Sequence, residues 1–358
     1  MTSKDIARRR VANQFVTGIK GASPSSVVSS MGAIQAQDYL SSLWAIGLRV
    51  SGCIRAYIEQ AIADRHIIRT WALRGTLHFV APHDVRWMLK HLAPRVLSVA
   101  ARRHRELELD DAVFTRSAKI FRRALDGGKA LTRPEMMELL ERARITTACQ
   151  RGYHILWKLA LNGLLCCGPR KGKQPTFVLL DEWLPPGGSQ SREAAIGDFA
   201  LRYFTSHGPA TIDDFAWWIG MKKSDATAVV ASIASQLSTF ATFKKRYWFK
   251  SSASLTRNGA HDLHLLPSFD EILLGYSDRT DALCPAHAQY IVPGTNGMFM
   301  PVIVQAGRVV GTWSRTLTKN SASLISKPFA TFSQRELKLF SAAAKRHVEF
   351  LGVKSVRD

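Results

Sequence analysis

The feature of this chain that most constrains its fold is a change of hydrophobic period near residue 66. Before that point, apolar residues recur with helical spacing, and Ser23-Pro24 is typical of a helix start because serine caps the first turn and proline is tolerated there. After it, residues 67–73 and 76–80 alternate with a period of two around Arg74-Gly75, which predicts a β-hairpin. Three helices followed by a short hairpin is the order of a winged helix-turn-helix unit.

The same order recurs twice further along the chain. Helical patterns return over residues 82–108, 112–125 and 150–164, and again over residues 193–206, 215–219 and 224–237. Short extended segments follow each set, at residues 164–168 and 176–180 and at residues 240–250. A Pro-Pro-Gly-Gly-Ser stretch at residues 185–189 predicts a linker. The remainder has strand-like segments at 261–267, 298–305 and 308–313, and a closing amphipathic helix over 334–351.

These patterns predict an α+β fold that is mainly helical. We expect three tandem winged helix-turn-helix units and a small C-terminal β-rich module. The expected bounds are residues 1–110, 111–190, 191–260 and 261–358. The repeat is one of architecture rather than of sequence identity.

The chain carries a large excess of positive charge. It has 49 Lys and Arg residues against 28 Asp and Glu, a net charge of +21. The four predicted segments contribute +8, +6, +4 and +3, so no single tail holds the excess. A folded protein with distributed basic residues most simply contacts an extended polyanion, and nucleic acid is the first candidate. Charge that serves solubility alone is the second interpretation. An anionic membrane surface is a weaker candidate than nucleic acid, because no Lys-rich amphipathic helix is evident.

Several classes of protein are excluded by the same composition. No apolar run approaches the roughly 18 residues that a membrane span needs. The N-terminal segment MTSKDIARRR lacks the apolar stretch of a signal peptide. The five cysteines are odd in number and contain no CxxC pair, so neither a disulfide framework nor a metal site is indicated. We therefore expect a cytoplasmic protein with no membrane partner and no metal site.

One polar cluster stands out as a candidate site. It is Ile34-Gln35-Ala36-Gln37-Asp38, at the junction of the second and third predicted helices. A Gln-x-Gln pattern alone is a weak signal. Its context strengthens it, because residues 69–80 downstream are rich in side chains that contact bases and phosphates. The chain has no Walker loop, GxGxxG, HExxH, GxSxG or zinc-ligand spacing that would point elsewhere.

Four stretches of the sequence resemble the AlkZ/YcaQ-like family of winged-helix DNA glycosylases. They are residues 34–38, the Arg-Thr-Trp-x-Leu-Arg-Gly-Thr-Leu-His segment at 69–78, the Leu-Leu-Pro-Ser-Phe-Asp-Glu segment beginning at 265, and residues 301–313. The resemblance covers the chain from near residue 5 to near residue 350. The Gln35-Ala36-Gln37 pattern resembles the AlkZ-like branch, with a smaller middle residue. The resemblance implies three tandem winged helices around a C-shaped basic cleft, and excision of alkylated purines from duplex DNA.

Two glutamines fit such a reaction only with a particular substrate. A glutamine amide has no useful basicity, so it cannot act as an ordinary general base. An N7-alkylated purine is already cationic, and its glycosidic bond is weakened without protonation. We therefore expect Gln35 and Gln37 to position the hydrolytic water and to place amide dipoles near developing positive charge. Residues two apart diverge by about 200° on a helix, so the helix must end or break at Gln37–Asp38.

The motif leaves two alternatives open. Asp38 is a carboxylate that could act as the true base, with a glutamine orienting it. The two glutamines could instead only cap backbone groups between two helices.

The candidate DNA contacts lie on predicted hairpins and loops. They are Arg69, Thr70, Trp71, Arg74, Thr76, His78, Lys171, Lys173, Lys222, Lys223, Lys244, Lys245 and Arg246. Trp71 and His78 have an equally good interpretation as core residues of the first hairpin. Asp270 and Glu271 suggest a buried turn network, with a supporting role near the cleft as the alternative.

The sequence thus predicts a monofunctional DNA glycosylase. We expect it to be a cytoplasmic monomer, nucleoid-associated when bound to DNA, and to need no cofactor, because the hydrolysis can use water alone. Its expected substrates are bulky or cross-linked N7-alkylpurines in duplex DNA, in repair or in self-resistance to alkylating agents. The alternative is a non-catalytic winged-helix DNA-binding protein such as a transcription regulator.

Overall fold

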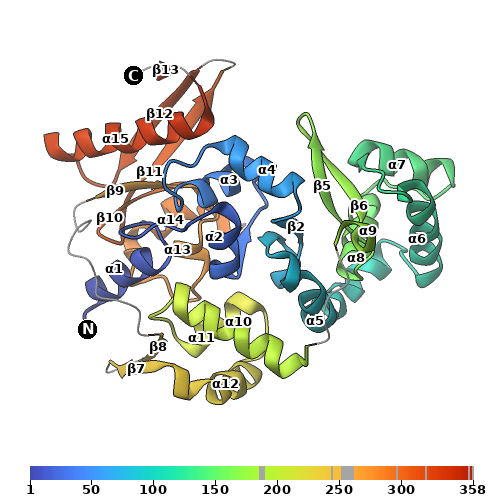
Figure 1. Ribbon diagram of the computed structural model, residues 1–358, viewed down its shortest axis with the longest axis horizontal. Helices are drawn as coiled ribbons and strands as arrows, with labels where there is room; N and C mark the ends of the chain where they lie inside the picture. Colours follow the sequence, from blue (N-terminus) through green and yellow to red (C-terminus); the bar gives the residue numbers. More distant parts are fainter. Residues whose placement is uncertain are drawn as a thin grey trace. The chain divides into compact units, whose positions relative to one another are not determined.

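The computed structural model describes residues 1–184, 190–242, 245–250, 262–295, 297–318, 321–353 and 355–356. Helices make up about 52% of these residues, and the sheets are largely antiparallel, so the α+β class is confirmed (Figure 1). The chain divides into two compact units. Unit 1 comprises Met1–Glu59 together with Ile196–Asp358, and unit 2 comprises Gln60–Ala195. Unit 1 is therefore built from both ends of the chain, and unit 2 from its middle.

Most helices of unit 1 begin close to where the sequence places them. The helices are α1 (Ser3–Asn13), α2 (Pro24–Met31), α3 (Tyr39–Gly47), α11 (Ile212–Ile219), α12 (Lys223–Ser232), α13 (Glu271–Leu274), α14 (Ala288–Ile291) and α15 (Gln334–Leu351). Two more, α4 (Arg55–Ala63) and α10 (Arg192–Ser206), span the points where the chain passes between units. The sequence pattern does not predict α13 and α14. The predicted start of α2 is explained by Ser23, whose hydroxyl accepts a hydrogen bond from the Ser26 backbone N–H at 3.1 Å.

The C-terminal part of unit 1 is a five-stranded sheet in the order β13-β12-β11-β10-β9. Its strands are β9 (Leu263–Leu266), β10 (Val302–Gln305), β11 (Arg308–Leu317), β12 (Ser321–Pro328) and β13 (Ser355–Val356). Strands β9 to β11 confirm the predicted strand-like segments, whereas the sequence pattern does not predict β12. Helix α15 lies against this sheet (Figure 1), and Trp44 of α3 packs on His347 and Phe350 of α15.

A short strand, β1 (Ala33–Gln35), replaces the end of a predicted helix. The helical spacing of Val27, Met31 and Ile34 extends the helix pattern to Ile34, and this prediction is wrong. Helix α2 ends at Met31 because Gly32 has a φ of +79°, a conformation that only glycine adopts readily. A Cβ atom at Gly32 would also lie 2.8 Å from the Phe199 ring. The glycine therefore turns the chain into an extended segment just before the Gln-Ala-Gln motif.

The described part of unit 2 combines helices with antiparallel strands in the order β3-β2-β5-β6-β4. Its helices are α5 (Pro82–Glu106), α6 (Asp111–Leu125), α7 (Arg133–Arg142), α8 (Arg151–Leu161) and α9 (Leu180–Trp183). Its strands are β2 (Ile68–Trp71), β3 (Leu77–Val80), β4 (Leu131–Thr132), β5 (Leu165–Lys171) and β6 (Gln174–Leu179). The predicted first hairpin is confirmed, because Thr70 pairs with His78 and Trp71 with Leu77 across β2 and β3.

An antiparallel hairpin follows helices in each of the three predicted passes. After β2–β3 and β5–β6, the third is formed by β7 (Ser238–Ala241) and β8 (Arg246–Phe249). The assignment of these passes to three winged-helix units with the stated bounds, and the C-shaped cleft, stay predictions. The predicted linker at residues 185–189 and the predicted contact Lys244 lie outside the described residues.

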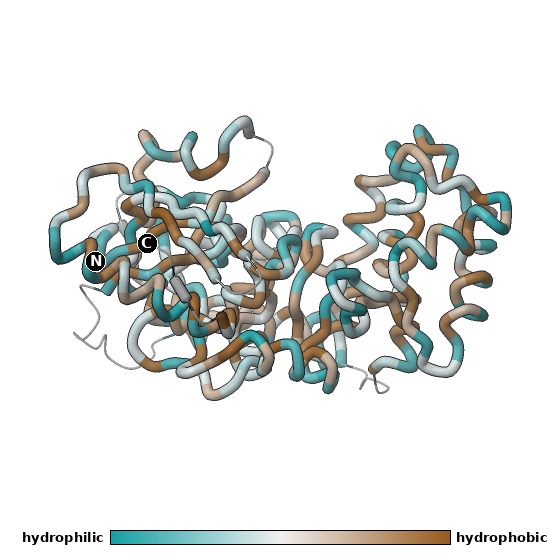
Figure 2. The backbone as a smooth tube through the Cα atoms, turned by 90° about the horizontal axis from the view of Figure 1, so that it is seen from above, coloured by the Kyte–Doolittle hydropathy of each residue, from teal (hydrophilic) through white to brown (hydrophobic). Residues whose placement is uncertain are grey.

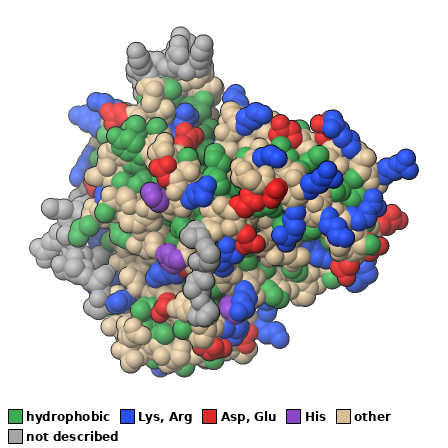
Figure 3. Space-filling model, turned by 45° about the vertical axis from the view of Figure 1, so that its right-hand side comes forward, with side chains coloured by type: hydrophobic (Ala, Val, Ile, Leu, Met, Phe, Trp, Pro, Cys, Tyr) green, Lys and Arg blue, Asp and Glu red, His purple; other side chains and the backbone are tan. Residues whose placement is uncertain are grey.

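Hydrophobic and charged residues are finely interspersed along both units. Figure 2 shows hydrophobic stretches alternating with hydrophilic ones, and within the described ranges no helix is long and apolar enough to cross a membrane. Figure 3 shows Lys and Arg side chains scattered over the visible face with acidic side chains among them. Among the residues that the structure describes, no group of three or more His, Cys, Asp or Glu side chains could hold a metal ion.

Candidate active site

The Gln-Ala-Gln motif lies in unit 1, between β1 and α3. Gln35 is the last residue of β1 and is 9% exposed, whereas Gln37 is exposed in the bend before α3. Neither glutamine lies in a helix, so the 200° divergence that a helix would impose does not apply. The motif lies between two helices, because α2 ends at Met31 and α3 begins at Tyr39.

Asp38 caps a helix at this junction. It is the N-cap of α3, and its Oδ1 atom accepts a hydrogen bond from the Ser41 backbone N–H at 3.0 Å. Such a cap satisfies a backbone donor that the first turn leaves without a helical partner. Burial lowers the pKa of Arg315, and the charge of Asp38 opposes that shift, so the two groups interact electrostatically. The sequence does not single out Arg315, because no local pattern connects it with residue 38.

A buried carboxylate contacts the motif from the opposite end of the sequence. Glu271, 1% exposed at the start of α13, accepts a hydrogen bond at Oε1 from the Gln35 backbone N–H at 3.2 Å. Its Oε2 atom accepts a second from the Trp218 indole Nε1–H at 2.9 Å and lies 3.6 Å from His207 Nε2. Burial lowers the pKa of His207, which favours its neutral form. Glu271 is thus buried, as the sequence suggests, and it contacts the candidate site directly.

The neighbouring residue holds the far end of the same segment. Asp270 accepts two hydrogen bonds from Arg49, which follows α3, at 2.8 and 2.9 Å. Arg49 also donates to the backbone oxygens of Gln14 and Ala45. Both charged partners are almost fully buried, with side chains 1% and 0% exposed. This bidentate pair confirms the buried turn network predicted for Asp270.

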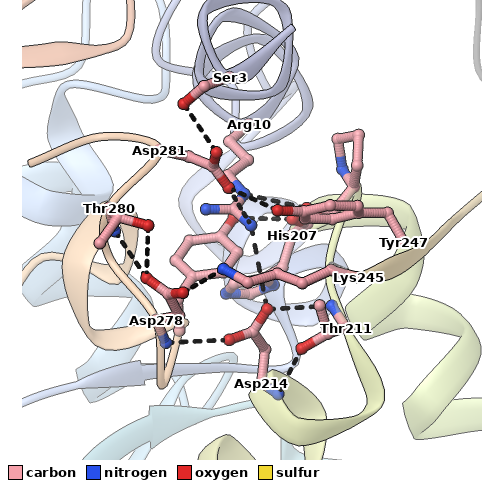
Figure 4. Close-up of polar contacts among 12 residues, drawn as sticks. Ser3, Arg10, His207, Thr211, Asp214, Lys245, Tyr247, Asp278, Thr280 and Asp281 are labelled. Carbon is pink, nitrogen blue, oxygen red and sulfur yellow. Dashed lines mark hydrogen bonds and ion pairs between the residues drawn. The ribbon is translucent and has the colours of Figure 1, made fainter. Parts of the chain in front are cut away.

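A second buried polar cluster joins α1 to the later part of unit 1 (Figure 4). Arg10 Nη2 lies 3.5 Å from Asp281 and 3.9 Å from Asp214, and Arg10 Nε donates to the Pro209 carbonyl at 2.9 Å. Burial raises the pKa of Tyr247, whose hydroxyl donates to Asp281 at 3.1 Å. None of these contacts involves the Gln-Ala-Gln motif, so the cluster fixes the fold of unit 1 rather than the site.

The candidate DNA contacts on the first hairpin are mostly buried. Thr70 and His78 are 0% exposed, Trp71 is 4% exposed and Arg69 is 9% exposed. Trp71 stacks on Phe177 with ring centroids 6.2 Å apart and planes 5° apart. This burial favours the core interpretation for Trp71 and His78. Arg74, in the turn, and Thr76 are half-buried, and DNA contact by all six hairpin residues stays a prediction.

The lysine and arginine candidates lie closer to solvent. Lys171, Lys173, Lys222, Lys223 and Arg246 are exposed. Lys171 approaches Glu135 at 3.4 Å and Lys223 approaches Asp213 at 2.8 Å. Exposed pairs of this kind contribute roughly 0–1 kcal/mol, so a phosphate can replace the carboxylate at little cost. Lys245 points toward Asp278 and pairs with it (Figure 4).

Comparison with known proteins identifies relatives of this chain and a solved structure with the same fold. The family model for AlkZ-like DNA glycosylases matches residues 28–350. An interstrand DNA cross-link repair glycosylase from Streptomyces sahachiroi is 26% identical over 336 residues, with 85% of each chain covered. The structure of the S. sahachiroi DNA glycosylase AlkZ matches with a TM-score of 0.80 and 22% identity, over 100% of this chain and 99% of that chain. At that identity the structural likeness shows the fold alone.

These matches define the class of the protein. It is a DNA glycosylase, an enzyme that acts on N-glycosyl bonds in DNA. More narrowly, the chain belongs to the AlkZ-like DNA glycosylase family, whose model covers both units and includes the Gln-Ala-Gln motif.

Proposed function

We propose that this enzyme is a monofunctional glycosylase that hydrolyses the N-glycosidic bond of bulky or cross-linked N7-alkylpurines in duplex DNA. The observation that carries the proposal is the placement of Gln35 and Gln37 outside any helix, in a chain of the AlkZ-like family. The relative named as an interstrand cross-link repair glycosylase supports cross-linked substrates and a role in repair. Self-resistance to alkylating agents is the other role that we propose. The reaction needs no cofactor, because water is its only co-reactant.

The chemistry follows from the charge of the substrate. When the bond between C1′ and N9 breaks, its electron pair returns to the cationic base, which leaves as a neutral N7-alkylpurine. The oxygen of water bonds to C1′ and releases a proton to solvent. Amide oxygens of Gln35 and Gln37 would accept hydrogen bonds from that water and stabilise the positive charge that develops on the sugar. Holding the water in place, rather than removing its proton, is the main demand on these side chains.

The position of Asp38 supports the glutamines over Asp38 as the principal groups. Its carboxylate already accepts the Ser41 N–H as the cap of α3. The alternative in which the glutamines cap helices is also weakened, since Asp38 fills the N-cap of α3 and Gly32 the C-cap of α2.

Duplex DNA is the proposed binding partner of a monomeric enzyme. The exposed lysines of the β5–β6 hairpin and of the start of α12 would contact backbone phosphates, which fix register without reading sequence. A bulky adduct is poorly suited to extrusion into a tight pocket, so a surface that tolerates the adduct suits these substrates better than ordinary base flipping.

The test is direct excision under single-turnover conditions. Protein in excess is incubated with a duplex containing N7-methylguanine and with a cross-linked duplex, and alkali-labile abasic sites are scored. We expect abasic sites from both, and strong loss in Gln35→Ala and Gln37→Ala. Asp38→Asn is the matched control, because asparagine is an equally good N-cap and removes only the charge. Activity in this control supports the glutamines.

Two results would overturn the proposal. DNA binding with no abasic sites above a heat-only control would indicate a non-catalytic binding protein. Loss of activity in Asp38→Asn, together with full activity in both glutamine variants, would make Asp38 the base.

A further inference from the structure

We propose that Glu271 is a positioning residue for catalysis, which holds the backbone of the Gln-Ala-Gln motif through the Gln35 N–H. The inference rests on the proposed role of Gln35 and Gln37 in hydrolysis. Its basis is the 3.2 Å contact between the Gln35 nitrogen and Glu271 Oε1, made across 236 residues of sequence. Glu271 is not assigned any contact with the substrate.

Each oxygen of the Glu271 carboxylate accepts a hydrogen bond from an N–H donor. An ionised carboxylate is an acceptor at both oxygens, and here each oxygen meets an N–H donor. Oε1 receives the Gln35 backbone N–H, and Oε2 receives the Trp218 indole N–H at 2.9 Å. A glutamine of the same size would accept only one of these bonds and would turn its NH₂ group toward the other donor. The site therefore requires the carboxylate, and an amide at this position disturbs Gln35 or Trp218.

Two consecutive side chains hold the two ends of the catalytic segment. Glu271 bonds the end of β1 at Gln35, and Asp270 binds Arg49 just beyond the end of α3. Asp270 also accepts the Ile272 N–H at 3.0 Å, which fixes the first turn of α13 itself. The segment between Gln35 and Arg49 contains Gln37. One buried turn thus contacts this segment at both of its ends.

This arrangement matters because water-positioning groups depend on exact placement. A displacement of about 1 Å in a catalytic group can cost roughly 100-fold in rate. The backbone atom that Glu271 holds belongs to one catalytic glutamine and lies two residues from the other. Loss of the bond would move both side chains without removing either.

The experiment measures the excision rate at saturating protein, the Kd for the damaged duplex and the thermal midpoint of Glu271→Gln. Asp214→Asn is the matched control, because Asp214 is an equally buried carboxylate of unit 1, also 1% exposed, that accepts backbone N–H bonds from Thr211, Ser277 and Asp278. Its contacts belong to the cluster of Figure 4 and not to β1.

We expect Glu271→Gln to lower the saturated rate by roughly 10- to 100-fold, with Kd unchanged within about twofold. Asp214→Asn is expected to lower the thermal midpoint at least as much and to keep the saturated rate. The indole N–H resonance of Trp218, assigned with Trp218→Phe, is expected to shift in Glu271→Gln. A carboxylate with a purely structural role would not lower the saturated rate while leaving Kd unchanged.

Three outcomes would overturn the inference. The first is a wild-type rate in Glu271→Gln, and the second is a parallel loss of rate and stability in both variants. Should Glu271→Gln fail to fold, Glu271→Asp replaces it, because aspartate keeps the charge but is one methylene shorter and does not reach Gln35. Full activity in Glu271→Asp would be the third outcome. Full activity in Gln37→Ala would instead remove the proposed function, so the two failures are distinguishable.

Discussion

The two units of this glycosylase differ in net charge for their length and in the number of charged side chains that they bury. Unit 2 has 23 Lys and Arg residues against 13 Asp and Glu, a net +10 in 136 residues, whereas unit 1 carries +11 in 222. Buried charged side chains, in contrast, are more numerous in unit 1. Of the eight buried Asp, Glu, Lys and Arg residues in the described part of the chain, six belong to unit 1: Arg10, Arg49, Asp214, Asp270, Glu271 and Asp281. The other two are Arg69 and Asp84 in unit 2.

Charged side chains therefore serve different purposes in the two units. Buried ion pairs are expensive to desolvate and contribute little net stability, but removing one partner is strongly destabilising. In unit 1, Glu271 and the Arg49–Asp270 pair contact the segment that carries Gln35 and Gln37. The other three buried charged residues form the separate cluster of Figure 4. Unit 2 leaves most of its charge at the surface, where it is available to phosphates.

The largest expected effect comes from breaking the best buried pair of unit 1. Arg49→Met leaves Asp270 buried without its guanidinium and should cost about 3–5 kcal/mol of unfolding free energy. The comparison in unit 2 is Arg142→Ala, which removes a pair with Glu138 whose arginine is 73% exposed, and should cost less than about 1 kcal/mol. Urea unfolding followed by circular dichroism measures both. Equal costs would contradict the contrast between the units.

The next effect is a loss of stability in acid to which two buried histidines of unit 1 contribute. Burial lowers the pKa of His264 and of His347 to about 3, and the nearby guanidinium groups of Arg346 and Arg315 act in the same direction. Both histidines are neutral in the folded state, while the unfolded chain protonates them below about pH 6.5. The unfolded state therefore binds more protons between about pH 6.5 and 3, and stability falls as the pH drops through that window.

The size of this acid effect can be measured by thermal unfolding. Lowering the pH from about 7 to about 5 should cost about 2 kcal/mol for each histidine. The double variant His264→Gln/His347→Gln should show a shallower dependence on pH. Identical pH profiles for this variant and the wild type would show that other groups cause the acid sensitivity.

The smallest expected effect concerns the surface of unit 2. Lys171→Ala/Lys173→Ala on the β5–β6 hairpin should reduce the slope of log Kd against log salt concentration by roughly 0.9 for each phosphate that these lysines neutralise. The control is Lys338→Ala, an exposed lysine of α15 in unit 1 that is not among the candidate contacts. An unchanged slope in the hairpin variant would remove Lys171 and Lys173 from the DNA-binding surface.

Local patterns in the sequence are sufficient for much of the fold. Period changes and caps predict α2, α3 and the β2–β3 and β5–β6 hairpins, because these signals act within a few residues. Strand β1 is not predicted because three residues are too few to show alternation and Ile34 continues the helical spacing of Val27 and Met31. Strand β12 is not predicted because its Ser-rich sequence gives little hydrophobic contrast.

The candidate site is predictable only in part. The sequence singles out Gln35 and Gln37 through family resemblance, and it suggests that Glu271 is buried. It does not connect Glu271 with Gln35, because 236 residues separate them and nothing local to either residue encodes the contact. The residue type of Asp38 fits both a helix cap and a catalytic base, and its hydrogen bond to Ser41 becomes visible only in the structure.

The claim that unit 1 carries the chemistry is tested most directly by the saturated single-turnover excision rate of Gln37→Ala on duplex containing N7-methylguanine. We predict a fall of at least about 100-fold, with Kd for the duplex unchanged within about twofold. A wild-type rate in this variant would contradict the catalytic role of the Gln-Ala-Gln motif.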